Sequence, residues 1–329
     1  MTTIHYEDEA DVAALDGSTV AVVGYGNQGR SWALNLRDSG LDPIVCVRAD
    51  ATRERAAAEG FQPVDVAEAS EADVVCVLVP DDAIAHLGLT RPADGLTIVA
   101  SGYTLAFDRF LPDGDVAMVA PRMLGPEVRR CYQEGVGFIT AVGVHDDRTG
   151  RAWPRTLAVA QAIGGLRQGA IELSPRQEAV LDPAVEQVLS PALTHVNGSF
   201  VQLMLEQGIP LEAVLTELTL SGEIERNYRL LREDGFVSQL DHHSPTSQYG
   251  QLSRRGRFDD VDLLSTMRDL CADITSGSFA DEWDEDRERG HPGLTRLREQ
   301  HAGPDLAELE RDLRRRLGPA VARPEPSPP

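Results

Sequence analysis

Short runs of apolar residues, rich in β-branched side chains, recur through the first half of the chain. They lie at residues 20–23, 43–47, 72–79, 97–100, 116–120, 137–144 and 169–173. The run at 72–79, ADVVCVLV, is apolar throughout, which is typical of a strand covered on both faces in a parallel sheet. Residues 153–163 have helical spacing instead. The pattern predicts an α/β domain that ends near residue 174.

From residue 175 onward the spacing changes. Apolar residues recur at helical intervals, as at Val214, Leu215 and Leu218, and no strand-like run remains. We therefore expect the α/β domain at residues 1–174 and an all-helical domain at residues 175–319. The remaining residues, 320–329, read AVARPEPSPP, and four prolines in ten residues predict a disordered tail.

A glycine-rich turn follows the first predicted strand and precedes a predicted helix. It consists of Gly24, Tyr25, Gly26, Asn27, Gln28 and Gly29. In such a turn Gly24 permits the sharp bend, Gly26 lets the backbone approach a pyrophosphate, and Gly29 lets helix and strand pack closely. The free N–H groups at the start of the helix attract phosphates. This context predicts a Rossmann-type dinucleotide-binding domain, and a purely structural turn is the alternative.

The loop after the second predicted strand should meet the adenosine ribose. It contains Arg48, Asp50, Thr52 and Arg53. An acidic residue here favours the free 2′-hydroxyl of NAD(H), whereas arginines and hydroxyls favour the 2′-phosphate of NADP(H). Asp50 argues for the first and its neighbours argue for the second, with solvated loop charges as the alternative. The sequence therefore leaves NADH and NADPH open.

Charge and hydropathy exclude several classes of partner. The formal net charge of −22 argues against nucleic acid and against anionic membranes, since both require a basic face. No apolar run approaches the ~20 residues that span a bilayer. The N-terminus, MTTIHYEDEADVAALDG, is acidic, unlike a secretory signal. We expect a cytoplasmic protein.

All 31 basic residues are arginines. A chain without lysine cannot form a Schiff base, and arginine remains protonated in proteins. The four cysteines lie far apart in the sequence and have neither metal-site nor disulfide-framework spacing.

Three carboxylates in the predicted helical domain have metal-ligand character. Asp182 and Glu186 are four residues apart and share one face of a helix, and Glu217 has the same spacing to Ser221. Carboxylates that converge from two helices are suitable ligands for Mg²⁺. In a chain with 53 acidic residues such pairs also arise by chance, so solvated helix faces remain the alternative.

Ordered motifs along nearly the whole chain resemble those of the short-form ketol-acid reductoisomerase family. They are GYGNQG at the turn, LVPDD with Pro80 and Asp81, APRMLGPEVRR at 120–130, AIGG at 162–165, Asp182 with Glu186, Ser244 with the following TSQYG, and SGSFADEW at 276–283. The resemblance implies a Rossmann-type domain followed by an all-α domain, knotted and interlocking in a homodimer. It also implies a magnesium-dependent alkyl shift in a 2-hydroxy-2-alkyl-3-keto acid, followed by reduction with a nicotinamide hydride.

The resemblance assigns site residues, and three of them depart from the family pattern. It implies metal ligands at Asp182, Glu186 and Glu217, a substrate-binding serine at Ser244, and cofactor contacts at the turn and at Pro80 and Asp81. Ser101 stands where the family has a histidine, Arg122 where it has a lysine, and Ser221 where it has the last metal-binding glutamate. Three changes around one pocket predict altered chemistry or lost activity.

The sequence thus favours a Mg²⁺-assisted, NAD(P)H-dependent reductase of a small 2-keto or 2-hydroxy-3-keto acid, with the alkyl shift weakened or lost. One alternative is an authentic ketol-acid reductoisomerase of branched-chain amino-acid biosynthesis. A second is a hydroxyacid or imine reductase, although the hydroxyacid dehydrogenases of that architecture resemble each other in a catalytic lysine that this chain lacks. A third is a non-catalytic nucleotide-binding protein.

Overall fold

The computed structural model describes residues 1–84, 86–301 and 304–317. Contacts within the chain divide it into two compact units, Met1–Pro183 and Ala184–Pro329. This division falls after the domain boundary that we expected at residue 174. The tail expected to be disordered, residues 320–329, lies outside the described residues.

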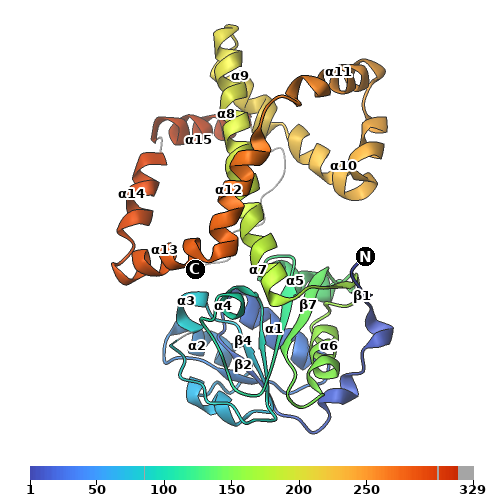
Figure 1. Ribbon diagram of the computed structural model, residues 1–329, viewed down its shortest axis with the longest axis vertical. Helices are drawn as coiled ribbons and strands as arrows, with labels where there is room; N and C mark the ends of the chain where they lie inside the picture. Colours follow the sequence, from blue (N-terminus) through green and yellow to red (C-terminus); the bar gives the residue numbers. More distant parts are fainter. Residues whose placement is uncertain (85, 302–303, 318–329) are drawn as a thin grey trace. The chain divides into compact units, whose positions relative to one another are not determined.

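The first unit is built on a β-sheet (Figure 1). Its eight strands have the order β1-β8-β7-β6-β5-β4-β2-β3. The strands are β1 (Ile4–His5), β2 (Val20–Val23), β3 (Ile44–Cys46), β4 (Val74–Val77), β5 (Leu96–Val99), β6 (Asp115–Pro121), β7 (Thr140–Asp146) and β8 (Ala170–Glu172). Strands β3, β2, β4, β5 and β6 run parallel, whereas β7 is antiparallel to β6 and β1 is antiparallel to β8. The sheet is therefore mixed, with its parallel part at the glycine turn.

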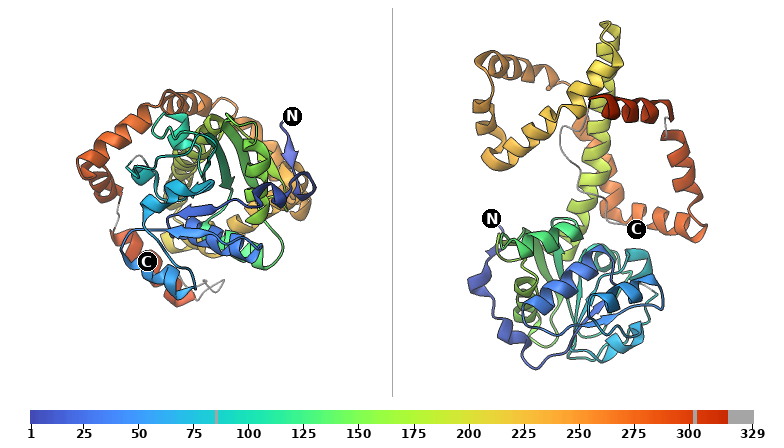
Figure 2. Two further views of the ribbon diagram at one scale, coloured as in Figure 1. Left: turned by 90° about the horizontal axis from the view of Figure 1, so that it is seen from below. Right: turned by 180° about the vertical axis from the view of Figure 1, so that it is seen from behind.

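Helices cover both faces of this sheet (Figure 2). They are α1 (Asn27–Asp38), α2 (Ala51–Ala58), α3 (Asp81–Ile84), α4 (Tyr103–Ala106), α5 (Gly125–Gln133) and α6 (Ala152–Ala162), with the short 3₁₀ helices η2 (Val12–Leu15) and η3 (Val66–Glu71). The 3₁₀ helix η1 (Glu7–Glu9) and helix α7 (Pro175–Ala184), which follows β8, contribute no residue to the cores on these two faces. In β2, Val20 and Val22 pack on the face of α1, while Ala21 and Val23 pack on the opposite face. Alternate residues of a strand point to opposite faces, so an apolar run without alternation is the pattern of a doubly covered strand.

The described residues of the second unit form helices joined by short turns and loops, with no strand among them. Its α-helices are α8 (Ser190–Glu206), α9 (Leu211–Leu215), α10 (Glu223–Ser238), α11 (Pro245–Arg255), α12 (Leu263–Ser276), α13 (Ser278–Glu288), α14 (Pro292–His301) and α15 (Pro304–Leu317). Between them lie two π-helical turns, η4 (Val185–Leu189) and η5 (Thr216–Leu220), and two 3₁₀ turns, η6 (Gln239–His242) and η7 (Gly256–Phe258). The expected order, an α/β dinucleotide fold followed by helices, is confirmed.

Helix α8 buries none of its residues against the described part of the chain. Its apolar side chains Leu193, Val196, Phe200 and Leu203 are 38–50% exposed. Across the described residues, no helix combines the length and the apolar character required to cross a membrane.

Candidate active site

The glycine turn between β2 and α1 has the geometry of a phosphate-binding turn. Gly24 has φ +98°, and a Cβ atom there would lie 2.6 Å from the carbonyl oxygen of Leu78. A Cβ atom at Gly29 would lie 2.2 Å from the carbonyl oxygen of Gly24. No atom lies within 4 Å of a Cβ built at Gly26, which caps the start of α1. Two glycines are thus required by packing, and the third leaves its backbone open to a ligand.

A cavity of about 340 Å³ lies beside this turn, at the carboxyl ends of β4 and β5. Its lining includes Gly26, Asn27, Gln28, Pro80, Asp81 and Ser101. Desolvation of the Asp81 carboxyl group raises its pKa to about 6, and the nearby negative charges of Glu178, Asp82 and Asp182 act in the same direction. The residue as a whole nevertheless reaches solvent. The structure therefore places the turn, both predicted strand-end residues and Ser101 around one cavity.

Two side chains of the turn are held by hydrogen bonds within the protein. Tyr25 is 1% exposed, and its hydroxyl donates to Glu59 at 2.7 Å. Burial and this carboxylate raise the pKa of Tyr25. The amide Nε2 of Gln28 donates to the carbonyl oxygen of Met123 at 3.1 Å, while its Oε1 accepts from Trp32 Nε1 at 3.2 Å. The contribution of these side chains is to hold the turn in place.

Asp50 lies at the N-cap of α2, where the adenosine ribose loop was predicted. Its carboxylate accepts from the backbone N–H of Thr52 at 2.9 Å and also from the Thr52 hydroxyl. The Arg48 guanidinium is 3.5 Å away and largely exposed. The Thr52 hydroxyl, followed by its backbone N–H, lowers the pKa of Asp50. The loop thus presents a charged carboxylate at neutral pH.

Arg53, in the first turn of α2, is held by groups that precede and follow this helix in the sequence. Its Nη2 donates to the carbonyl oxygen of Val47 at 3.0 Å and forms an ion pair with Asp65. Arg55, which was not among the predicted site residues, donates from Nη2 to the carbonyl oxygen of Tyr25 at 3.0 Å. Thirty residues separate Arg55 from Tyr25, and no motif or spacing signals their contact.

Arg122 follows the carboxyl end of β6 and forms ion pairs with two carboxylates of α7 through two different nitrogens. Nη1 donates to Glu178 Oε1 at 2.7 Å, and Nη2 donates to Asp182 Oδ1. The other oxygen of Glu178 accepts from the backbone N–H of Gly102 at 2.7 Å. We call Arg122, Glu178 and Asp182 the Arg122 clamp. Their side chains are 28%, 2% and 49% exposed, respectively, so the clamp runs from the interior to the surface.

Ser101 and Gly102 connect the clamp to the cavity beside the turn. A Cβ atom at Gly102 would lie 2.1 Å from the carbonyl oxygen of Pro175, the first residue of α7. This close approach lets the backbone of Gly102 reach Glu178. The neighbouring Ser101 Oγ lines the cavity and accepts from the Tyr103 N–H at 3.2 Å.

Glu178 was not among the predicted site residues. Burial raises its pKa, while the Gly102 N–H and the Arg122 guanidinium act in the opposite direction. Its spacing of four residues before Asp182 places both carboxylates on one face of α7. Extending the predicted carboxylate pair by one helical turn toward the N-terminus would have identified it.

The remaining predicted residues lie in the second unit; they are Glu186, Glu217, Ser221 and Ser244. Glu186 lies in η4 and Glu217 in η5. Ser221 Oγ donates to the carbonyl oxygen of Glu217 at 3.2 Å, and Ser244 caps α11 by accepting from the Ser247 N–H. A cavity of about 560 Å³ beside Glu217 is lined also by residues of α15, including Arg316.

The predicted ligands Asp182, Glu186 and Glu217 carry carboxylate oxygens, the type of ligand that Mg²⁺ prefers. This ion keeps several waters and needs only one or two protein carboxylates. Asp182 is half exposed and already binds a cation through one oxygen. In the described ranges of a single chain, no three His, Cys, Asp or Glu side chains are grouped to hold a metal ion. The described part of one chain therefore offers Asp182 as a possible ligand but does not form a complete metal site.

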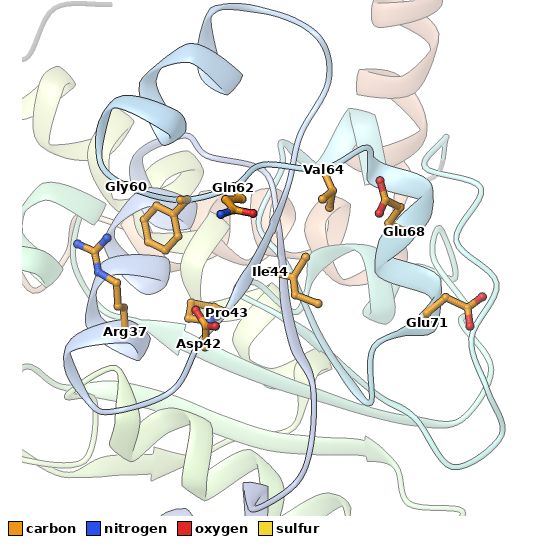
Figure 3. Close-up of a pocket in the computed structure, with 10 residues that line it drawn as sticks. Arg37, Asp42, Pro43, Ile44, Gly60, Gln62, Val64, Glu68 and Glu71 are labelled. Carbon is orange, nitrogen blue, oxygen red and sulfur yellow. The ribbon is translucent and has the colours of Figure 1, made fainter.

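A third cavity, of about 590 Å³, lies beside the edge strand β3 (Figure 3). It contains none of the predicted site residues. Its lining residues are Arg37, Asp42, Pro43, Ile44, Gly60, Phe61, Gln62, Val64, Glu68 and Glu71. Arg37 is committed to the fold there, because it donates to the carbonyl oxygen of Glu59 at 2.7 Å and lies over the Phe61 ring.

Sequence and structure comparisons agree over nearly the entire chain. Residues 14–169 match the family described as acetohydroxy acid isomeroreductase, NADPH-binding domain, and residues 176–318 match ketol-acid reductoisomerase, C-terminal domain. A ketol-acid reductoisomerase (NADP(+)) from Caldivirga maquilingensis is 37% identical over 324 residues, covering 96% of this chain and 98% of the relative. The solved structure of an NADH-preferring ketol-acid reductoisomerase from an uncultured archean shares 27% identity. Its TM-score is 0.85, over 95% of this chain and 98% of that one.

Proposed function

Because the chain belongs to the ketol-acid reductoisomerase family of NAD(P)-dependent oxidoreductases, we propose that it reduces a 2-keto or 2-hydroxy-3-keto acid with magnesium assistance. We further propose that its alkyl-shift step is weakened or lost. The observation that carries this second part is the Arg122 clamp, in which an arginine binds the predicted metal ligand Asp182.

The nicotinamide cofactor would bind through the glycine turn. The open backbone at Gly26 and the N–H groups at the start of α1 would receive the pyrophosphate. The cavity at the ends of β4 and β5 would then receive the nicotinamide end, beside Ser101 and Asp81. We propose that NADH is favoured over NADPH, since Asp50 presents a charged carboxylate while Arg53 is engaged by Asp65.

Asp182, Glu186 and Glu217 would hold Mg²⁺, which when bound polarises the substrate carbonyl. Arg122 would add a fixed positive charge beside Asp182 that can attract the substrate carboxylate. Reduction then requires a placed hydride, a polarised carbonyl and one proton for the new alkoxide oxygen, and solvent water can supply that proton without a titrating side chain.

The alkyl shift makes a further demand, because it needs protons moved to and from substrate oxygens. Ser101 has no group that titrates near neutral pH, and the Arg122 guanidinium stays protonated. Ser221 supplies no carboxylate. General acid–base groups typically contribute about 10²–10⁴-fold, so changes at several such positions would slow the shift more than the reduction.

Two other functions remain as alternatives to this proposal. The sequence matches over both domains favour an authentic ketol-acid reductoisomerase of branched-chain amino-acid biosynthesis, which would turn over 2-acetolactate. A non-catalytic nucleotide-binding protein would oxidise neither cofactor with any substrate. Assays of purified protein with a panel of 2-keto and acetohydroxy acids, with NADH or NADPH and with or without Mg²⁺, separate the three.

We also propose that the protein is a homodimer. The apolar stripe of α8, Leu193, Val196, Phe200 and Leu203, is left exposed in the single chain. Exposed apolar stripes of this extent mark interaction surfaces, and most soluble oligomers are symmetric homo-oligomers. A second copy would cover the stripe and could complete the metal site at Asp182.

A further inference from the structure

We propose that the Arg122 guanidinium is a built-in counter-ion of Asp182, so that a divalent metal ion gains this carboxylate only in competition with the arginine. The chain would then bind Mg²⁺ more weakly than a variant without this cation. The inference rests on the proposed function, since that is where Asp182 is taken as a magnesium ligand.

The geometry fixes the guanidinium at two points. Nη1 is bound to Glu178, which is buried and is itself anchored by the Gly102 N–H at 2.7 Å. Nη2 is thereby directed to Asp182 Oδ1. A planar guanidinium offers two separate nitrogens for two carboxylates, whereas a lysine ammonium is a single point. Arg122 therefore cannot leave Asp182 without disturbing a buried partner.

The protonation state of Arg122 makes the competition permanent. A guanidinium does not lose its proton in proteins, so no accessible pH releases the positive charge. A metal ion at Asp182 would approach this charge directly, and like charges at such separations repel. Asp182 has one oxygen engaged by Nη2, and at most the other is left for a metal ion.

The charges at the clamp show why removal of the arginine needs a compensating change. Loss of Arg122 alone would leave Glu178 buried with only the Gly102 N–H. An unpaired buried carboxylate is strongly destabilising. Changing Glu178 to glutamine at the same time removes one positive and one negative charge, so the net charge of the protein is unchanged and Asp182 is freed.

Binding of Mn²⁺ as a magnesium substitute, followed by electron paramagnetic resonance on the full-length protein, tests the inference without reference to activity. The variants are Arg122→Met/Glu178→Gln, Arg122→Lys and Asp182→Asn. Arg129→Met is the matched control, because it breaks a partly buried ion pair with Asp38 on α1 that includes no predicted metal ligand. We expect the double variant to bind Mn²⁺ about tenfold more tightly than the wild type, because the metal ion no longer has to displace the charge-assisted hydrogen bond between Arg122 and Asp182. Arg129→Met should leave the affinity unchanged.

The outcomes separate this inference from the proposed function. If Asp182→Asn abolishes binding but the double variant and Arg122→Lys bind no more tightly than the wild type, the competition is refuted while the metal site stands. If Asp182→Asn leaves binding unchanged, the metal assignment itself fails, and the inference fails with it. Should the double variant not fold, Arg122→Lys decides, because its ammonium cannot hold both carboxylates in the same way.

Discussion

Asp50 is the residue on which the choice between NADH and NADPH depends in our proposal. One of its oxygens caps α2 through Thr52, and Arg48 lies 3.5 Å from the other. The carboxylate would accept ribose hydroxyls of NADH and repel the 2′-phosphate of NADPH. Arg53, which argued for NADPH in the sequence, is directed to Val47 and Asp65 instead.

Replacing Asp50 by serine or asparagine should raise the ratio of kcat/KM for NADPH to that for NADH by about tenfold, the loss of one repulsive charge. Both residues are good N-caps, so α2 should keep its stability. Asp42→Ser, which removes an exposed charge before β3, is the control and should not change the ratio. An unchanged ratio in both Asp50 variants would show that Asp50 is only a capping residue.

Residue roles were predictable from the sequence where a motif fixes the backbone conformation. They were less predictable where side chains far apart in the sequence contact each other. Gly24 and Gly29 have the packing that their positions in the turn predicted. The orientation of Tyr25 toward Glu59 was not predictable, because it depends on a partner 34 residues away. Arg122 was selected as a departure from the family pattern, but its bond to Glu178 emerged only from the fold.

At the scale of elements, the glycine turn and the loop that carries Arg122 are joined by side chains of α1. Gln28 donates to the carbonyl oxygen of Met123, and Ser31 Oγ donates to that of Gly125 at 2.7 Å. A Cβ atom at Gly125 would lie 2.2 Å from the carbonyl oxygen of Asn27, so α1 and α5 begin in direct contact. The cofactor turn therefore supports the position of the clamp.

Gln28→Leu should lower the free energy of unfolding by about 1 kcal/mol, the typical net value of a hydrogen bond. It should lower kcat while leaving KM for the cofactor nearly unchanged, because the side chain holds the Arg122 loop rather than the cofactor. Ser31→Ala breaks the second bond to the same loop and should act in the same direction. A rise in cofactor KM without loss of stability would instead identify Gln28 as a direct cofactor contact.

The start of β6, at the edge of the sheet opposite the cavity beside the glycine turn, contains a buried ion pair. Asp115 and Arg155 are 0% and 6% exposed and 2.6 Å apart, and Asp115 also accepts from the Thr149 hydroxyl. Asp115→Ala should cost about 3–5 kcal/mol in urea unfolding, since it leaves Arg155 buried without its carboxylate. Asp113→Ala, at an exposed ion pair with Arg148, should cost at most about 1 kcal/mol. Similar costs for both variants would contradict this account.

Strands were predictable from the sequence where they are long, apolar and central, as at β2 and β4. Strand β1, Ile4–His5, was not predicted, because two residues at the edge of a sheet leave no periodicity to detect. The antiparallel direction of β7 beside β6 was also not predicted. An apolar run indicates a buried strand, but it carries no information about direction. The helical second unit followed from its 3.6-residue spacing.

At the scale of the whole molecule, the proposed dimer would allow the two copies to share their sites. In our proposal Glu217 of one copy reaches the metal held by Asp182 and Glu186 of the other. Asp182→Ala and Glu217→Ala proteins should each be inactive, and refolding them together should restore activity in the heterodimers that carry one intact site. Verified heterodimers without any recovery would contradict shared sites, although a dimer with separate sites would remain compatible with the exposed stripe of α8.

The central claim is that reduction has survived better than the alkyl shift, and one comparison of turnover tests it most directly. The purified, Mg²⁺-loaded protein is given NADH or NADPH with either 2-acetolactate or the preformed 3-hydroxy-2-keto acid. The triple variant Ser101→His, Arg122→Lys, Ser221→Glu is assayed beside the wild type. These changes should raise turnover of 2-acetolactate more than turnover of the preformed keto acid. We predict that the wild type reduces the preformed keto acid at least about 100-fold faster, since the shift lacks acid–base groups. Comparable turnover of both substrates by the wild type would contradict the account and identify an ordinary ketol-acid reductoisomerase.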